Sequence, residues 1–150
     1  CSPHWWTNKR YGSAVVASLN RALDELSKGF EGVVLIGHSG GGTLAMLIAS
    51  DRTDVKDIIT LAANLDTTAW TEKHGYSPLI GSLNPAEKPM LSPDIRQTHY
   101  QGLDDDVVLG YMNQPTINKQ HNANYIELPN VDHRCCWQEL WPDALLRLTP

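Results

Sequence analysis

A serine among glycines lies between two apolar runs of the sequence. The stretch GHSGGG covers residues 37–42 and places the hydroxyl of Ser39 in a turn made of small residues. Glycine suits backbone that bends sharply, adopts a positive φ or approaches another group closely. The runs VVLI (33–36) and TLAMLIA (43–49) on either side predict a buried strand, a tight turn and a helix. Phosphate binding, dinucleotide binding and nucleophilic attack all use such a turn.

The sequence disfavours the first two of these chemistries. Residues 37–42 have the glycine spacing of a P-loop, but Thr43 occupies the position of the required lysine. Residues 40–45 match G-x-G-x-x-A, and Asp66 follows the next predicted strand, where a ribose-binding acid would lie. Two residues separate that match from the strand end, however, and a dinucleotide site gives the downstream motifs no role. A dinucleotide-binding domain therefore remains an alternative.

Nucleophilic catalysis uses more of the sequence. Residues 37–41 match G-x-S-x-G, in which the small residues on either side of the serine are expected to avoid collisions. The N–H of Gly40 would point at the developing oxyanion, next to the N-terminus of a helix. A serine also needs a base and an orienting acid. Aspartates 104–106 directly follow one predicted strand, and His133 follows the last one.

The elements that must position these residues alternate along the chain. Apolar residues at helical spacing predict an amphipathic helix from about Ser13 to Lys28, and residues 66–93 are expected to form a loop region with short helices. The other expected elements are strands at 32–37, 58–62, 95–102 and 124–130, and helices at 42–50 and 136–148, the last broken at Pro142. This alternation predicts an α/β fold with a parallel sheet flanked by helices.

With base and acid in this order, the chain resembles the α/β-hydrolase superfamily over nearly its whole length. The resemblance implies a triad of Ser39, His133 and an aspartate, with no cofactor. The superfamily commonly places its acid in G-x-x-D-x-x-V, which residues 102–108 match with Asp105. Asp104 and Asp106 are rivals for that role.

Asp66 is a further rival, because some members place the acid after the preceding strand. The resemblance also implies a serine hydrolase acting on ester or related acyl bonds, with Gly40 as one oxyanion donor. The short cap-like insertion at 66–93 is expected to lie over the cleft. His38, next to Ser39, and Trp70, within this insertion, are the candidate substrate-binding residues, and the expected substrate is a small or medium acyl ester.

The resemblance is to the C-terminal part of such enzymes. Their usual N-terminal strands and second oxyanion donor have no counterpart in CSPHWWTNKRYG (1–12), so we expect residues 1–150 to form a partial or truncated domain. A non-catalytic binding module or an inactive truncated hydrolase is the competing interpretation. The apolar strand at 32–37 would form an open edge, which favours a homodimer or a partner chain that supplies the missing strands.

Composition limits the function classes. The 150 residues are 41% hydrophobic and 19% charged, as in one soluble globular domain, and the net charge of −5 argues against nucleic acid. No apolar run is long enough to span a membrane. There are three cysteines, and we expect the neighbours Cys135 and Cys136 not to bond to each other but to pack beneath the histidine loop. Together with Asp132 and His133 they lack paired ligand spacing, so no metal site is expected, and a cytoplasmic location is favoured.

Overall fold

The computed structural model describes residues 2–146 and 148 and shows a parallel sheet between helices. Every strand pair is parallel, and the strands lie side by side in chain order, β1-β2-β3-β4. Their bounds are β1 Val33–His38, β2 Val55–Leu61, β3 Arg96–Gly102 and β4 Ala123–Leu128. Because all the strands run in one direction, their carboxyl ends meet at a single edge of the sheet.

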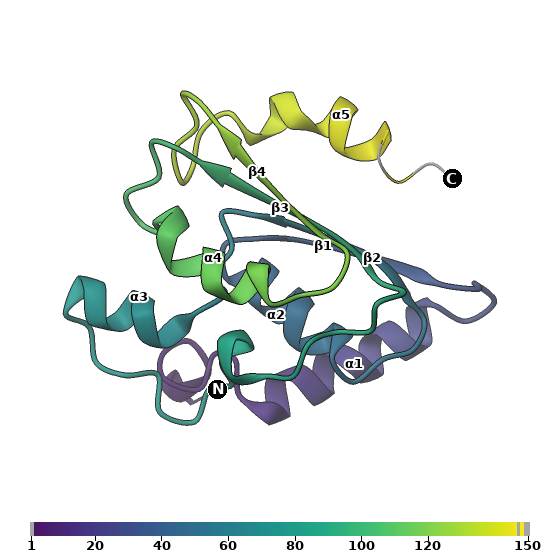
Figure 1. Cartoon of the computed structure of the whole chain (residues 1–150). Coiled ribbons are helices and arrows are strands. Elements are labelled where there is room, and N and C mark those ends of the chain that lie inside the picture. Colours follow the sequence, from purple (N-terminus) through teal and green to yellow (C-terminus); the bar gives the residue numbers. More distant parts are fainter. Residues whose placement is uncertain (1, 147, 149–150) are drawn as a thin grey trace.

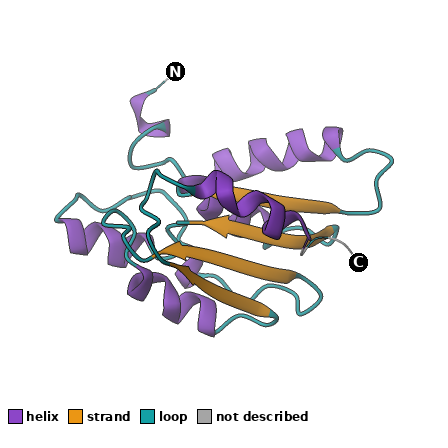
Figure 2. Ribbon diagram, turned by 90° about the horizontal axis from the view of Figure 1, so that it is seen from above, coloured by secondary structure: helices purple, strands orange, loops and turns teal. Residues whose placement is uncertain are grey.

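Helices cover both faces of this sheet (Figures 1 and 2). In Figure 1, α5 lies on one side, and α1, α2, α3 and α4 lie on the other. The helices are α1 Ser13–Leu26, α2 Gly40–Ala49, α3 Thr67–His74, α4 Gly110–Asn118 and α5 Trp141–Leu146, with 3₁₀ turns η1 Pro3–Trp5, η2 Pro85–Glu87 and η3 Trp137–Leu140. The expected parallel sheet with flanking helices is therefore confirmed.

The core is divided by the sheet. Neighbouring residues of β2 point to opposite faces, so Ile58 packs with Met46 of α2 while Ile59 packs with Trp137 and Ala144 on the other side. A third cluster joins α1 to α2. α2 is thus held between β2 and α1, which fixes the helix that starts directly after Ser39.

Some element boundaries differ from the sequence expectation. β2 begins at Val55 rather than at residue 58, because Asp57 is buried in the strand by an ion pair of 2.8 Å with Arg96 of β3. The expected helix at 136–148 is instead η3 followed by α5, and its residue 147 lies outside the described residues. Pro142 lies in the first turn of α5, where a missing N–H breaks no helical hydrogen bond.

Within residues 2–146 and 148, no helix combines the length and the apolar character that a bilayer crossing requires.

Candidate active site

Ser39 lies in the turn between β1 and α2, at the carboxyl edge of the sheet. Its backbone has φ +52° and ψ −122°, which a residue with a side chain rarely adopts. The turn is tied to the sheet by the N–H of Ser39, which donates to the carbonyl of Leu61 over 2.8 Å. A strained serine between a strand and a helix is the geometry that exposes a nucleophilic hydroxyl above a sheet.

The glycines around Ser39 differ in whether the turn has room for a side chain in their place. A Cβ at Gly37 would lie 2.3 Å from the backbone of Gly41, and a Cβ at Gly42 would lie 2.4 Å from the Cβ of Ala63. A Cβ at Gly41 would meet nothing within 4 Å. The expected crowding is therefore found at Gly37, two residues before the serine, but not at Gly41, two residues after it. On that side of the serine it is Gly42 that lies too close to Ala63 for a side chain.

Gly40 is the first residue of α2, so its N–H has no acceptor within the helix. The helix N-terminus carries a partial positive charge, which favours an anion at this position. The hydroxyl of Tyr11 fills the space beside Gly40, where a Cβ would lie only 2.6 Å from it. The geometry at Gly40 is compatible with the expected role as oxyanion donor.

His133 lies between the other two candidate triad residues. Its Nδ1 is 2.9 Å from Oδ2 of Asp105, and its Nε2 is 3.0 Å from Oγ of Ser39. A carboxylate only accepts, so Nδ1 carries the proton, and Nε2 is free to accept from the serine hydroxyl. The structure thus brings Ser39, His133 and Asp105 into one hydrogen-bonded line.

The Asp105 carboxylate is buried at the end of β3, with the residue 3% exposed. Its Oδ1 accepts from the N–H groups of Val107 (2.9 Å) and Val108 (2.8 Å). Burial acts to raise the pKa of Asp105, but the hydrogen bonds from His133, Val108 and Val107 outweigh it and hold the pKa below its ordinary value. The group is therefore ionised at neutral pH.

The rival acids lie elsewhere. Asp104 and Asp106 are exposed to solvent. Asp66 caps α3, where its Oδ1 accepts from the N–H groups of Thr68 and Ala69, each over 3.1 Å. Of the four aspartates considered, Asp105 is the one in contact with His133.

The two candidate substrate-binding residues both donate to backbone carbonyls of the site. Nε2–H of His38 donates to the carbonyl of His133 over 2.8 Å, and Nε1–H of Trp70 donates to the carbonyl of Val107 over 2.9 Å. The ring of Trp70 also lines a groove of about 350 Å³ together with Tyr76 and Leu79. Their contact with a substrate stays a prediction.

Cys135 and Cys136 are joined by a disulfide, contrary to expectation. The chain turns at Cys136, which has φ +76°, and this turn brings the two neighbouring sulfurs together. Both cysteines were expected to pack beneath the histidine loop; Cys136 packs partly against the core cluster of Trp137 and Ala144, whereas Cys135 is exposed. The argument from unpaired cysteines for a reducing compartment therefore loses its basis.

Three residues that hold the site were not anticipated in these roles. Gln101 is buried and donates to the carbonyl of Val108 over 2.7 Å, and Trp137 donates to the carbonyl of His133 over 3.3 Å. His74 donates from Nε2 to the carbonyl of Val107 over 2.8 Å. The sequence contains a signal for Gln101, because a glutamine inside a buried strand needs a hydrogen-bond partner. It contains none for Trp137 and His74, because their acceptors are backbone carbonyls of loops.

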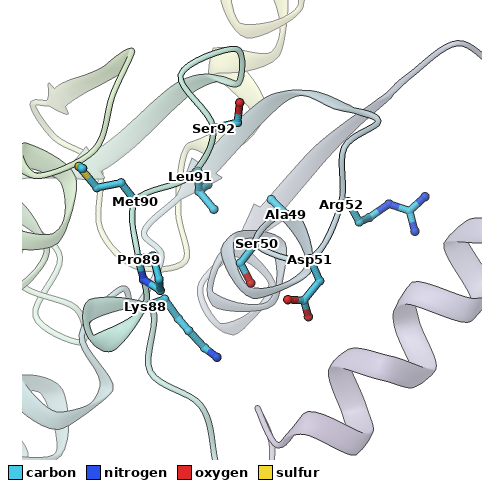
Figure 3. A pocket seen from close by; sticks show the side chains of 9 residues that line it. All are labelled: Ala49, Ser50, Asp51, Arg52, Lys88, Pro89, Met90, Leu91 and Ser92. Carbon is cyan, nitrogen blue, oxygen red and sulfur yellow. The ribbon is translucent and has the colours of Figure 1, made fainter.

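A cavity of about 420 Å³ lies beside His133 and is lined by Asp104, Asp106, Asp132 and Arg134, among others. Another cavity, of about 270 Å³, lies at the far end of α2 (Figure 3). Its walls include Ser50 and Lys88, which Figure 3 shows beside the open space. Because α2 separates this second cavity from Ser39, the cavity beside His133 is the candidate substrate site.

Comparison with solved structures identifies the fold. The chain resembles the esterase domain of a Rhodothermus marinus protein (TM-score 0.62, 19% identity, 79% of this chain and 60% of that chain). It also resembles an α/β hydrolase from the metagenome of sediments of the Mar Chica lagoon in Morocco (0.67, 17%, 89% and 68%) and Est1E from Butyrivibrio proteoclasticus (0.66, 17%, 89% and 67%).

These similarities show that the chain has the α/β-hydrolase fold over most of its length. It spans about 60% of the first of these structures and about two thirds of the other two. No protein-family model matches the sequence, and no curated protein sequence matches it.

Proposed function

We propose that this chain carries the machinery of a serine hydrolase that cleaves ester or related acyl bonds. The observation that supports this most strongly is the line of hydrogen bonds from Ser39 Oγ through His133 to Asp105, at 3.0 and 2.9 Å. Both contacts lie within the reach that proton transfer to a general base requires. A protein with the same fold, from Rhodothermus marinus, is described as an esterase domain, which favours an ester as the bond attacked.

In the proposed first step, Ser39 Oγ attacks the acyl carbon of the substrate. His133 Nε2 takes the hydroxyl proton, and the Asp105 carboxylate stabilises the imidazolium that forms. The negative charge on the substrate oxygen is stabilised by the N–H of Gly40 and by the N-terminus of α2.

The tetrahedral intermediate then collapses. The bond to the leaving alcohol breaks, the imidazolium gives that oxygen its proton, and the acyl group remains as an ester on Ser39. Water, deprotonated by His133, attacks this acyl-enzyme, and the acid is released as Ser39 regains its proton.

The substrate is proposed to be a small or medium acyl ester. The cavity beside His133 includes Val107, whose carbonyl accepts from Trp70. Trp70 in turn lines a second groove with Tyr76 and Leu79, and the apolar wall of this groove is proposed to take the acyl chain. Turnover of p-nitrophenyl esters of increasing chain length would measure this preference.

A fluorophosphonate probe tests the proposed function directly, because it reacts with activated serines. We expect the wild type to be labelled at Ser39 and Ser39→Ala to remain unlabelled. Ser50→Ala, at the far end of α2, is the matched control and should label as the wild type does. An unlabelled wild type that turns over esters no faster than Ser39→Ala would favour a non-catalytic binding module instead.

A further inference from the structure

The loop that carries Asp105 is held from outside by α3. The carbonyl oxygen of Val107 accepts two hydrogen bonds, from Nε1–H of Trp70 at 2.9 Å and from Nε2–H of His74 at 2.8 Å. Trp70 and His74 are four residues apart, so they lie on the same face of α3, one turn apart. Both donors of this helix face are thus directed at a single acceptor.

The accepting carbonyl belongs to the same peptide group as a donor to the candidate triad acid. A peptide group is planar and trans, so its C=O and N–H point in opposite directions. The carbonyl of Val107 points toward α3, and the N–H of Val108, at the other end of that group, donates to Oδ1 of Asp105 over 2.8 Å. Hydrogen bonds therefore run from the two rings of α3 through one peptide group to the carboxylate.

Such a chain has two physical effects. Donation to the carbonyl polarises the peptide group, which strengthens the bond from its N–H to the carboxylate. It also prevents rotation of the peptide group, and with Oδ1 fixed, Oδ2 stays 2.9 Å from His133 Nδ1. On the inner side, Gln101 holds the next carbonyl, that of Val108, over 2.7 Å.

Neighbouring rings hold the two donors in place. The rings of His74 and Tyr76 stack with centroids 5.2 Å apart, and the ring of Trp70 meets that of Tyr76 edge to face at 5.1 Å. Because the carbonyl of Val107 can only accept, His74 must present its proton on Nε2. Trp70 and His74 are therefore oriented toward the loop rather than free to rotate.

We propose that Trp70 and His74 are positioning residues for the triad acid, acting through the peptide group between Val107 and Val108. The proposal rests on the proposed hydrolase function and extends it to the segment 66–93, which would then stabilise the catalytic geometry as well as lie near the substrate. It assigns the indole N–H of Trp70 to the catalytic machinery rather than to the substrate.

The test removes the donors and keeps the rings. In Trp70→Phe/His74→Phe both N–H groups are lost, whereas Trp70→Phe/His74→Gln retains an amide N–H at about the reach of Nε2. With p-nitrophenyl acetate as substrate, we expect kcat of the first variant to fall by about 10- to 100-fold with KM nearly unchanged, because misplacement of a catalytic group mainly affects the chemical step. The glutamine variant should recover a substantial part of kcat.

Lys73→Gln is the matched control, since it changes an exposed side chain of the same helix without removing a donor to Val107. Its kcat should stay closer to wild type than that of the double phenylalanine variant. Should the double variant fail to fold, the single variants His74→Phe and His74→Gln provide the same comparison. Melting temperatures of all variants separate loss of stability from loss of rate.

Three results would overturn the inference. The first is a double phenylalanine variant with wild-type kcat, and the second is equal loss in the phenylalanine and glutamine variants. The third is a rise in KM at constant kcat, which would mean that the two side chains contact the substrate. Fluorophosphonate labelling of the wild type is measured first: if Ser39 labels, any of these results overturns the inference alone, and if it does not, the proposed function and this inference fail together.

Discussion

Three consecutive aspartates follow β3, and their surroundings differ sharply. The middle one, Asp105, is buried and accepts from two backbone N–H groups and from His133, while Asp104 and Asp106 are exposed at the rim of the cavity beside His133. Mutual repulsion among three adjacent carboxylates is reduced when the outer two stay in water. One carboxylate can therefore be buried and ionised without the cost of burying its neighbours.

Because of this difference, Asp→Asn substitutions at the three positions can serve as controls for one another. In Asp105→Asn the new amide would donate to His133 Nδ1 and hold the ring in the wrong tautomer, so we expect the rate of ester hydrolysis to fall by about 10³- to 10⁴-fold. Asp104→Asn and Asp106→Asn should change the rate only slightly. Steady-state kinetics with one ester checks all three variants, and a larger loss at either outer position would contradict the assignment of Asp105.

At the scale of elements, the turn into α2 depends on Gly42 more than on its neighbour Gly41. Gly42→Ala would place a Cβ 2.4 Å from Ala63 and 3.2 Å from Thr60, so we expect it to lower the free energy of unfolding by about 1–3 kcal/mol. Gly41→Ala meets open space inside a helix and should be neutral or stabilising by up to about 1 kcal/mol. Urea unfolding of the two variants measures the contrast, and equal effects would show that the turn relaxes around either methyl group.

The strands β2 and β3 bury a histidine whose protonation should affect stability. His99 lies beside Thr60, with Nδ1 2.8 Å from the hydroxyl oxygen, and burial lowers the pKa of His99 from 6.5 to about 4. Between these pH values the unfolded chain binds a proton that the folded chain does not, so stability falls as the pH is lowered from 6.5 to 4. The full loss is about 3 kcal/mol, at about 1.4 kcal/mol for each unit of the pKa difference.

Urea unfolding at several pH values measures this dependence. We expect His99→Gln to lose most of the fall in stability between pH 6.5 and 4, whatever its absolute stability. His121→Gln, at an exposed position, should keep the wild-type dependence. The lowered pKa of Asp105 acts in a separate window, since its contribution is lost only as the pH falls below 3.8. If the unfolding free energy of His99→Gln fell with pH as steeply as that of the wild type, His99 would not be the source of the pH dependence.

The elements and the candidate site were predictable to different extents. The strands and the turn at Ser39 are marked in the sequence by apolar runs and by glycines. Parallel strands bring their carboxyl ends together. The sequence therefore predicts that Ser39, Asp105 and His133 lie at the same edge of the sheet. The start of β2 was missed because the charged pair Lys56 and Asp57 interrupts the apolar run.

Contacts that depend on tertiary structure could not be anticipated. The N–H of Trp70 reaches a carbonyl 37 residues further along the chain, and a backbone acceptor has no residue type to reveal it. The same holds for the bond from His38 to the carbonyl of His133. His38 was expected to contact substrate because it adjoins Ser39, and Trp70 because the segment 66–93 was expected to lie over the cleft; the hydrogen-bond partners of both were not evident.

At the scale of the whole molecule, β1 forms an edge of the sheet. Within the described part of the chain its strand partner is β2 alone. The N–H groups of Val33 and Ser39 donate toward the β2 side, so the backbone groups of the alternate residues 34, 36 and 38 point away from it. Val34 and Ile36 also expose 42% and 41% of their surface. An apolar edge with free backbone groups is a template for pairing with another strand.

We therefore expect this chain to associate through β1. A two-fold axis would pair the β1 strands of two copies antiparallel and extend one sheet through both subunits, because a homodimer needs only one self-complementary patch. Light scattering at tens of micromolar should give a dimer mass, and Ile36→Lys, which places a charge on this edge, should give a monomer. Ile80→Lys, at a side chain 73% exposed in the segment 66–93, is the control and should leave the dimer intact. A wild-type chain that stays monomeric with cooperative unfolding would exclude the homodimer; capture of a separate chain that supplies strands next to β1 would then be the form of association to measure.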